Sequence, residues 1–88
     1  RPGFAERILT PRELSRPITP EYVAGRWAAK EAAFKCVPGL GTFRAIEIVS
    51  DESGRLVART DLPTNTFLWV SISHERDYAV AFAVLESA

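Results

Sequence analysis

The side chains of this chain best suited to chemistry are one carboxylate and two ammonium groups on a single short segment. Lys30, Glu31 and Lys35 stand among alanine and aromatic residues. At about 100° per residue in a helix, Glu31 shares a stripe with Trp27 and Phe34, while the two lysines project to either side. A carboxylate among aromatic side chains needs a cation, a metal or several donors to offset its desolvation. The segment could therefore hold a metal ion or an anionic group.

A simpler interpretation of the same segment is a solvated helix face. Glu31 and Lys35 would then form an ion pair across one helical turn, worth about 0.2–0.5 kcal/mol. Helix geometry alone favours this interpretation, because glutamate is rarely kept fully buried. Arg26, one turn before Lys30, is open to the same two interpretations, since it could contact a phosphate or simply face solvent.

One further candidate comes from a different part of the chain. His74, the only histidine, ends a predicted strand in phase with Val70 and Ile72. A histidine at a strand end is usually a turn or structural residue, and short motifs that contain one give many false positives. Ser71 and Ser73 lie on the opposite face of the strand, where we expect them to make supporting hydrogen bonds. His74 by itself therefore leaves the function undecided.

Three segments form an ordered set of motifs that is far more specific than any one of them. They read FAERILTPREL (4–14), GRWAAKEA (25–32) with Lys35, and VSISH (70–74) followed by DYAVA (77–81). Together they resemble the 4′-phosphopantetheinyl transferases, and most closely their small holo-[acyl-carrier-protein] synthase group. The matched segments span most of the chain, so the resemblance extends to the whole fold.

The resemblance implies an activity, a cofactor and partners. The family transfers the 4′-phosphopantetheine arm of coenzyme A to a serine of an acyl carrier protein, with Mg²⁺ as cofactor, in fatty acid biosynthesis. Such a reaction requires that developing negative charge be neutralised and that a weak nucleophile be positioned. Mg²⁺ suits this work because it binds carboxylate and phosphate oxygens and keeps several waters. The family's small members are trimers with coenzyme A between subunits, so we expect a homotrimer.

Roles for five residues follow from the same resemblance. Glu31 is expected to bind Mg²⁺, and Arg26, Lys30, Lys35 and His74 are expected to contact coenzyme A through its phosphates. Glu31, Lys35 and His74 are the expected catalytic residues. The base that deprotonates the serine could be Lys35, or Glu31 acting through a water molecule. We favour Lys35 as an electrostatic clamp, because a neutral lysine needs a strongly lowered pKa, which nearby phosphates oppose.

The resemblance also concerns where the carrier protein docks and which second residue binds Mg²⁺. Phe4 and Arg7 fall where the family docks its acidic carrier protein, although helix packing explains them equally well. The family begins with a Gly-x-Asp strand whose aspartate is a second Mg²⁺ ligand, and no such segment precedes Arg1. We therefore expect a single domain, residues 1–88, that lacks its N-terminal strand. If that aspartate is missing, the alternative is a non-catalytic module that binds coenzyme A or a carrier protein.

Composition narrows the class of protein. Eleven basic residues balance eleven acidic ones among 88, so no overall field favours nucleic acid or an anionic membrane. A chain of this length has one small core and gains from oligomerisation. The single Cys36 excludes an internal disulfide framework. The sequence shows neither a run of about 18 apolar residues nor a signal-peptide pattern, which makes the cytoplasm the expected location.

These residues must be positioned by helices in the first half and strands in the second. Thr19 and Pro20 signal the start of a main helix over 20–37, and a short helix is expected to begin at Thr10. Trp27 is expected in the core. Alternating apolar residues predict four strands, at residues 45–50, 55–60, 67–73 and 78–85.

The two halves are expected to meet through small side chains. The last strand carries alanines at every second position from Ala79 to Ala83, and the main helix carries Gly25, Ala29 and Ala33 on one face. Small residues on both elements allow a helix and a sheet to approach closely. The predicted fold class is therefore α+β, with an antiparallel sheet packed against a central helix in the 4′-phosphopantetheinyl transferase fold.

Overall fold

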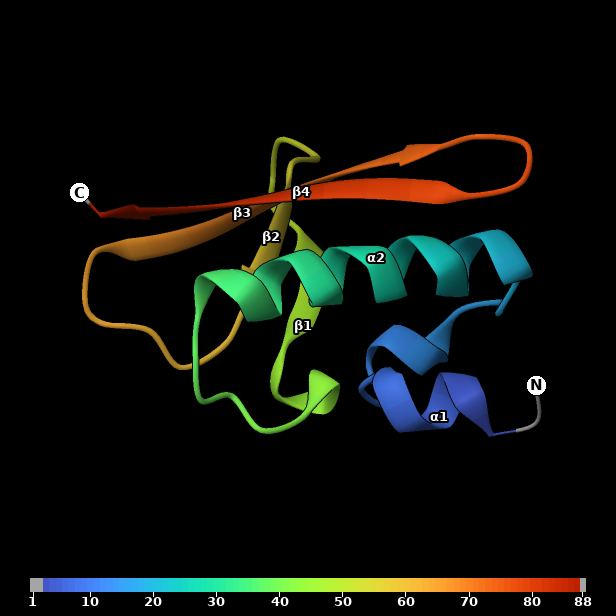
Figure 1. The fold of residues 1–88 in the computed structure, drawn as a ribbon, viewed down its shortest axis with the longest axis horizontal. Helices are drawn as coiled ribbons and strands as arrows, with labels where there is room; N and C mark the ends of the chain where they lie inside the picture. Colours follow the sequence, from blue (N-terminus) through green and yellow to red (C-terminus); the bar gives the residue numbers. More distant parts are fainter. Residues whose placement is uncertain (1–2, 88) are drawn as a thin grey trace.

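The structure, a computed structural model, describes residues 3–87 and has the predicted α+β architecture. In chain order its elements are α1 (Phe4–Ile8), the 3₁₀ turn η1 (Glu13–Ser15), α2 (Pro20–Cys36), the 3₁₀ turn η2 (Phe43–Ala45), β1 (Glu47–Ser50), β2 (Leu56–Arg59), β3 (Thr66–His74) and β4 (Ala79–Ser87). Figure 1 shows α2 between the long strands β3 and β4 on one side and the N-terminal segment on the other. The central helix is thus covered on two sides.

Helix α2 begins as the sequence predicts. Thr19 Oγ1 accepts a hydrogen bond from the backbone N–H of Tyr22 at 3.1 Å, and Pro20 occupies the first turn, where its missing N–H is no loss. The helix ends at Cys36, one residue before the expected end, and Val37 is already extended. The prediction of one long central helix is confirmed.

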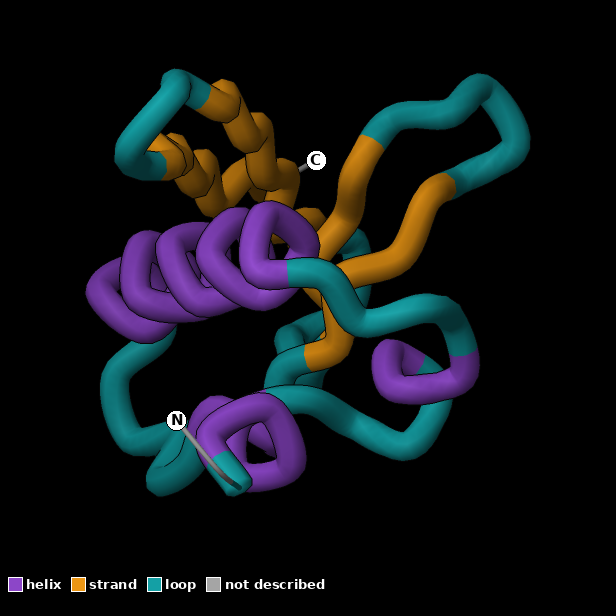
Figure 2. The backbone as a smooth tube through the Cα atoms, turned by 90° about the vertical axis from the view of Figure 1, so that its right-hand side faces the viewer, coloured by secondary structure: helices purple, strands orange, loops and turns teal. Residues whose placement is uncertain are grey.

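The sheet is a meander in the order β1-β2-β3-β4, with every neighbouring pair antiparallel. β3 and β4 pair along their whole length, so that His74 lies opposite Ala79. Ala81 and Ala83 of β4 are half-buried against the core that α2 completes. The tube in Figure 2 shows the β1–β2 hairpin twisting away from this helix-covered part of the sheet. The predicted contact between alanines of the helix and alanines of the sheet is confirmed.

The face of α2 that enters the core is made of its smallest residues. Ala29 and Ala33 are fully buried and share one cluster with Ile46, Ile48, Ala58, Leu68 and Val70. The expectation that Trp27 belongs to the core is wrong, since 39% of its surface is exposed. Phe34 packs against the edge of the core, whereas Trp27, whose indole cannot fit where small residues of the helix meet the sheet, turns outward. Glu31 turns outward with it and is exposed.

Some predicted boundaries differ from the structure for local reasons. The alternation predicts a strand from residue 45, but Phe43–Ala45 forms η2, in which Thr42 Oγ1 accepts a hydrogen bond from the N–H of Arg44 at 3.3 Å. The predicted strand over 55–60 is shortened to β2 at both ends, whereas β4 runs past residue 85 to Ser87. The short helix expected from Thr10 is the single 3₁₀ turn η1.

Candidate functional site

A buried ion pair attaches α2 to the N-terminal segment. Lys30 is fully buried, and its ammonium nitrogen lies 2.6 Å from Ile8 O, 2.6 Å from Glu13 Oε1 and 3.3 Å from Phe43 O. An ammonium group has three donors, and the chain's own oxygens occupy all of them. Figure 2 shows α1 and η2, which supply two of these oxygens, on the side of α2 away from β3 and β4.

The carboxylate of this pair is a junction for several elements. Glu13 Oε1 also accepts the backbone N–H of Thr10 at 2.8 Å, and Glu13 Oε2 accepts that of Ile48 in β1 at 2.7 Å. Thr10 Oγ1 in turn accepts the N–H of Glu13 at 3.3 Å, which completes a capping box. The Tyr22 hydroxyl donates to Glu13 O at 2.8 Å. Glu13 therefore ties η1, α2 and β1 together.

The burial of Lys30 decides its role. Burial lowers its pKa from the usual value, and the hydrogen bond and negative charge of Glu13 oppose that shift. An ammonium with no exposed surface and three protein acceptors has no donor left for a bound molecule. The structure of the single chain therefore does not support the expectation that Lys30 contacts the phosphates of coenzyme A. Its place in the motif reflects the attachment of α2 to the N-terminal segment.

Glu31 and Lys35 lie one turn apart on the outward face of α2, and both are exposed. Within residues 3–87 no ion pair joins them, so the simpler interpretation of this segment is not realised. The expected apolar setting of Glu31 is not realised either, because Glu31 and the neighbouring Trp27 are exposed. The residues from 3 to 87 contain no group of three or more histidine, cysteine or carboxylate side chains placed to share a metal. Glu31 could supply one ligand to a cation, with the others coming from a bound molecule and water.

Arg26 lies on a different side of the helix, about 140° around its axis from Glu31. Its guanidinium carbon is 4.7 Å from the centre of the Tyr22 ring. In the described part of the chain, Nε of Arg26 is buried and has no hydrogen-bond partner. A buried donor without an acceptor is costly and uncommon. Arg26 is thus suited to an acceptor outside this chain, but a single copy of the chain does not bring it together with Glu31 and Lys35.

His74 lies at the end of β3, where its exposed imidazole reaches the side of α2. A Cβ built on Gly25 would lie 2.8 Å from His74 Cε1 and 3.0 Å from His74 Nε2. The ring therefore lies against the backbone of α2 at Gly25, the residue just before Arg26. A small hollow of about 150 Å³ adjoins it, lined by residues of the α2 N-terminus and the β3–β4 turn. The structure thus brings His74 to the N-terminal half of α2, whereas Glu31 and Lys35 occupy the C-terminal half.

A larger apolar groove lies between α1 and the outward face of α2. Its volume is about 550 Å³, and it is lined by Phe4, Ala5, Ile18, Thr19, Pro20, Val23, Ala24 and Trp27. The rings of Phe4 and Trp27 meet edge to face, with centroids 6.3 Å apart. Arg7 is exposed at the end of α1. Arg7 does not line the groove but follows its lining residue Phe4 by about one helical turn. An apolar groove with an exposed cation on the same short helix is suited to a partner that has apolar and acidic side chains.

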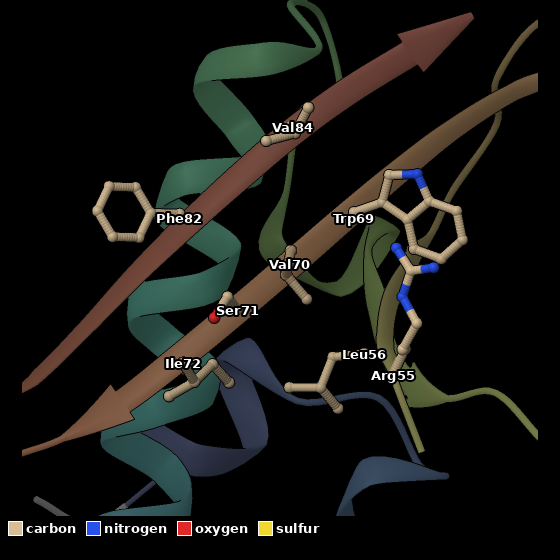
Figure 3. A pocket seen from close by; sticks show the side chains of 8 residues that line it. All are labelled: Arg55, Leu56, Trp69, Val70, Ser71, Ile72, Phe82 and Val84. Atoms are coloured by element: carbon tan, nitrogen blue, oxygen red, sulfur yellow. The ribbon is translucent and has the colours of Figure 1, made fainter. Parts of the chain in front are cut away.

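The outer face of β3 and β4, opposite α2, is strongly apolar and open. Val80, Phe82 and Val84 are 41%, 71% and 58% exposed. These strands border a hollow of about 440 Å³. Figure 3 shows Phe82 and Val84 on one side of it and Trp69 and Arg55 on the other. The guanidinium of Arg55 lies 3.9 Å from the centre of the Trp69 ring. Such a row of exposed large apolar side chains is unusual for a face that stays in water.

Sequence reasoning missed the role of Glu13 and the contact between His74 and Gly25. The spacing Thr10-x-x-Glu13 is a capping-box signal, and it could have identified Glu13 as a residue with a local structural role. Nothing in the sequence pairs Glu13 with Lys30, which is 17 residues away. Likewise, no pattern places His74 against Gly25, because that contact depends on where β3 ends relative to α2.

Comparison with known protein families shows which family has this arrangement of residues. A model of the 4′-phosphopantetheinyl transferase superfamily matches residues 1–83. The chain belongs to this superfamily. It is by that membership a phosphopantetheinyl transferase, and the family and fold class predicted from the three motifs are confirmed.

Individual relatives agree over nearly the whole chain. The holo-[acyl-carrier-protein] synthase of Geobacillus kaustophilus is 50% identical over a match 95 residues long. The match covers 94% of this chain and 71% of the relative. The synthase of Halalkalibacterium halodurans is 42% identical over 96 residues, covering 97% and 78%. None of the helices within residues 3–87 combines the length and the apolar character needed to cross a membrane.

Solved structures of such enzymes have the same fold. The Bacillus anthracis holo-(acyl-carrier-protein) synthase in complex with CoA (3′,5′-ADP) superposes with a TM-score of 0.79 at 41% identity, covering 97% of this chain and 81% of that one. The Helicobacter pylori enzyme in complex with coenzyme A gives 0.74 at 26% identity, covering 94% and 81%. The fold described above therefore occurs in proteins that hold coenzyme A.

Proposed function

We propose that this phosphopantetheinyl transferase uses coenzyme A as donor and modifies a serine of an apo acyl carrier protein, as part of cytoplasmic fatty acid biosynthesis. The observation that carries the donor is the buried Nε of Arg26, which has no acceptor within residues 3–87. Phosphate oxygens are strong acceptors for a guanidinium. Two solved relatives bind coenzyme A or its 3′,5′-ADP part on the same fold, which supports this assignment.

The phosphates of coenzyme A would be contacted by Arg26, Lys35 and His74. All three carry hydrogen-bond donors, and Lys35 and His74 are exposed. Lys35 would act as an electrostatic clamp on the pyrophosphate. Because Arg26 and Lys35 lie on different sides of α2, one extended molecule bound along the helix would have to reach both, or a second copy of the chain would have to supply part of the site.

Glu31 would hold Mg²⁺. Its carboxylate is exposed and has no protein partner in the described part of the chain, so an ion could bind without displacing a salt bridge. One carboxylate suits Mg²⁺, which commonly takes one or two protein carboxylates and fills its shell with phosphate oxygens and water. When bound, the ion would neutralise negative charge on the phosphates. The protein's own part is to present this carboxylate one turn from Lys35.

The carrier protein would dock at the groove between α1 and α2. Phe4 and Trp27 give this groove apolar walls, and the exposed Arg7, about one turn after Phe4 on α1, would add a positive charge near it. Carrier proteins of this kind are acidic, so the charges are complementary. Trp27 stands on the same outward face of α2 as Glu31, one turn away. A carrier docked here would present its serine toward the metal and the pyrophosphate.

The active assembly would be a homotrimer that covers the outer face of β3 and β4. Val80, Phe82 and Val84 would meet a second copy there, and this would remove a large apolar area from water. The substitution Phe82→Lys is expected to give monomers by light scattering at micromolar concentration. Ile18→Lys, also at an exposed apolar residue but outside this face, should leave the assembly intact. A wild-type protein that is a folded, active monomer would contradict this part of the proposal.

Transfer itself can be measured directly. The protein is incubated with Mg²⁺, coenzyme A and an apo acyl carrier protein, and the carrier is then weighed by mass spectrometry. The expected result is a gain of one phosphopantetheine on the carrier, which is abolished when its acceptor serine is replaced by alanine. If the protein binds coenzyme A but modifies no carrier, the proposal is contradicted, and the alternative of a non-catalytic binding module takes its place.

A further inference from the structure

Gly25 stands in the interior of α2, where a glycine has a cost. Relative to alanine, glycine destabilises a helix interior by about 1 kcal/mol. A positive φ is the usual reason to keep one, but the positive-φ glycines among the described residues are Gly3, Gly39, Gly41 and Gly54. Gly25 is an ordinary helical residue, and it is buried. The reason for glycine at this position must therefore be space.

The space is occupied by His74. A Cβ on Gly25 would lie 2.8 Å from Cε1 and 3.0 Å from Nε2 of the imidazole, and 3.2 Å from Cγ2 of Ile72. Non-bonded carbon atoms have their optimal separation at about 3.5–4.0 Å. A methyl group at residue 25 and the imidazole in its present place are thus mutually exclusive. The missing side chain of Gly25 forms a notch in α2, and the imidazole of His74 fills it.

The notch is what fixes the ring. Within residues 3–87, no hydrogen bond joins either ring nitrogen of His74 to the protein. The side chain is exposed at the very end of β3, and an exposed turn of residues 75–78 follows it. An exposed side chain without hydrogen bonds changes rotamer on a picosecond-to-nanosecond timescale unless packing restrains it. Contact with the backbone of α2 supplies that restraint.

We propose that Gly25 is a positioning residue, which holds the imidazole of His74 against α2 so that it can meet the phosphates of the donor. This inference rests on the proposed function, in which His74 contacts coenzyme A. It adds a residue that touches neither donor nor acceptor and acts only through His74. The notch also leaves both ring nitrogens without a protein partner, so that either could donate to a phosphate oxygen.

The substitution Gly25→Ala separates positioning from folding. The atoms that the new methyl would meet at under 3.1 Å belong to the end of one exposed side chain, which can swing away, while Ile72 needs to give by only a few tenths of an ångström. Alanine also favours the helix over glycine. We therefore expect Gly25→Ala to fold with a melting temperature at or above that of the wild type, with the imidazole displaced.

The displacement can be observed without any ligand. His74 is the only histidine of the chain, so selective ¹³C labelling of histidine gives one assignable ring signal. In the wild type, the Cε1 proton should show a nuclear Overhauser contact to the Hα protons of Gly25. In Gly25→Ala the ring signal should shift and its contacts to α2 should weaken. An unchanged ring signal in the folded variant would overturn the inference.

A double-mutant cycle then connects the notch to the donor. His74→Ala is expected to weaken coenzyme A binding by about tenfold to a hundredfold, the usual effect of losing a hydrogen bond to a charged group. Gly25→Ala should weaken it by a comparable factor, and adding it to His74→Ala should cause no further loss, because the methyl then has room. A loss that persists at full size in the His74→Ala background would mean a general structural role for Gly25 and would overturn the inference.

The two levels of the proposal fail in different ways. If His74→Ala binds coenzyme A as well as the wild type, the assigned ligand role of His74 is lost, and the positioning role of Gly25 for the donor is lost with it. If His74→Ala weakens binding while Gly25→Ala does not, the ligand role stands and only the inference about Gly25 is overturned. If both single variants weaken binding and the ring shifts in Gly25→Ala, both stand.

Discussion

Lys30 and Glu31 are neighbours in the sequence, yet the structure gives them opposite surroundings. Lys30 is fully buried and donates to three oxygens of the chain, one of them from Glu13. Glu31 is exposed and has no protein partner within residues 3–87. Both belong to the same motif, so a motif match alone does not separate a residue that holds the fold from one that meets a ligand. Burial and hydrogen bonds separate them.

The largest effect is expected from breaking the buried pair. Lys30→Met leaves the Glu13 carboxylate buried without its cation, which costs about 3–5 kcal/mol when one partner of a buried pair is removed. Urea unfolding followed by tryptophan fluorescence, at fixed protein concentration, measures the loss. Lys35→Met is the matched control on the exposed side, where the free energy of unfolding should change by less than about 0.5 kcal/mol.

A second variant tests whether the charge of Glu13 causes that loss. Glu13→Gln keeps the shape and removes the charge, so adding it to Lys30→Met should recover part of the stability. The comparison between Lys30 and Glu31 would break if Lys30→Met were as stable as the wild type but bound coenzyme A poorly. That result would show that Lys30 contributes to ligand binding despite its burial.

The next effect concerns the exposed carboxylate. Glu31→Gln removes the charge that would hold Mg²⁺, so transfer should fall by about a hundredfold or more, or ~2.7 kcal/mol in the barrier. The free energy of unfolding should change little, because the carboxylate has no protein partner to lose. Glu52→Gln, the same change in the exposed β1–β2 turn, is the control. Wild-type transfer by Glu31→Gln at limiting Mg²⁺ would remove Glu31 from the metal site.

A smaller effect is expected at the docking groove. Arg7→Glu reverses the exposed charge beside Phe4 and Trp27, and we expect the KM for the carrier protein to rise by about tenfold while the KM for coenzyme A stays the same. The difference should shrink at high salt, because exposed charges are screened. Arg59→Glu on β2 is the control for a general effect of charge. Equal KM values for the two variants would place the carrier elsewhere.

The smallest effect comes from a carboxylate that is exposed but held by hydrogen bonds. Asp51 Oδ1 accepts from the N–H and the hydroxyl of Ser53 and from the N–H of Arg55, which lowers the pKa of Asp51 below its usual 3.8. A lowered carboxyl pKa stabilises the fold above pH 3.8, and the contribution disappears as pH falls through the lowered value. Asp51→Asn should therefore be less stable than the wild type at neutral pH, by a small amount that vanishes in acid. A stability difference that persists unchanged below the lowered pKa would contradict this assignment.

Local signals predicted the elements of this fold well. Thr19 and Pro20 marked the start of α2 because capping and proline chemistry act within one turn. The alternating alanines from Ala79 to Ala83 predicted a strand that lies close to a helix, and two of them, Ala81 and Ala83, pack against the core cluster. Where one residue settles the local structure, the sequence was sufficient.

The prediction failed where two distant segments decide the outcome. Trp27 was expected inside because it is large and apolar, but the sheet packs on the small face of α2 and leaves the indole 39% exposed. Lys30 was expected to face a ligand, because its partner Glu13 is remote in the sequence and belongs to a turn that forms against β1. Helix geometry gives the angle between two side chains, but it does not tell which side the rest of the chain will cover.

Glu13 also matters for the border of the sheet. Among the strands of residues 3–87, β1 lies at the end of the sheet, so within these residues the backbone groups on its free side have no neighbouring strand. Unpaired edges of this kind can pair with strands of other molecules and start aggregation. The Glu13 carboxylate takes the free N–H of Ile48 in the middle of this border, and Lys30 neutralises the carboxylate that does so. Loss of either Glu13 or Lys30 would therefore leave the edge strand β1 unprotected. Variants at these positions should form β-rich aggregates more readily than equally unstable variants elsewhere in the chain.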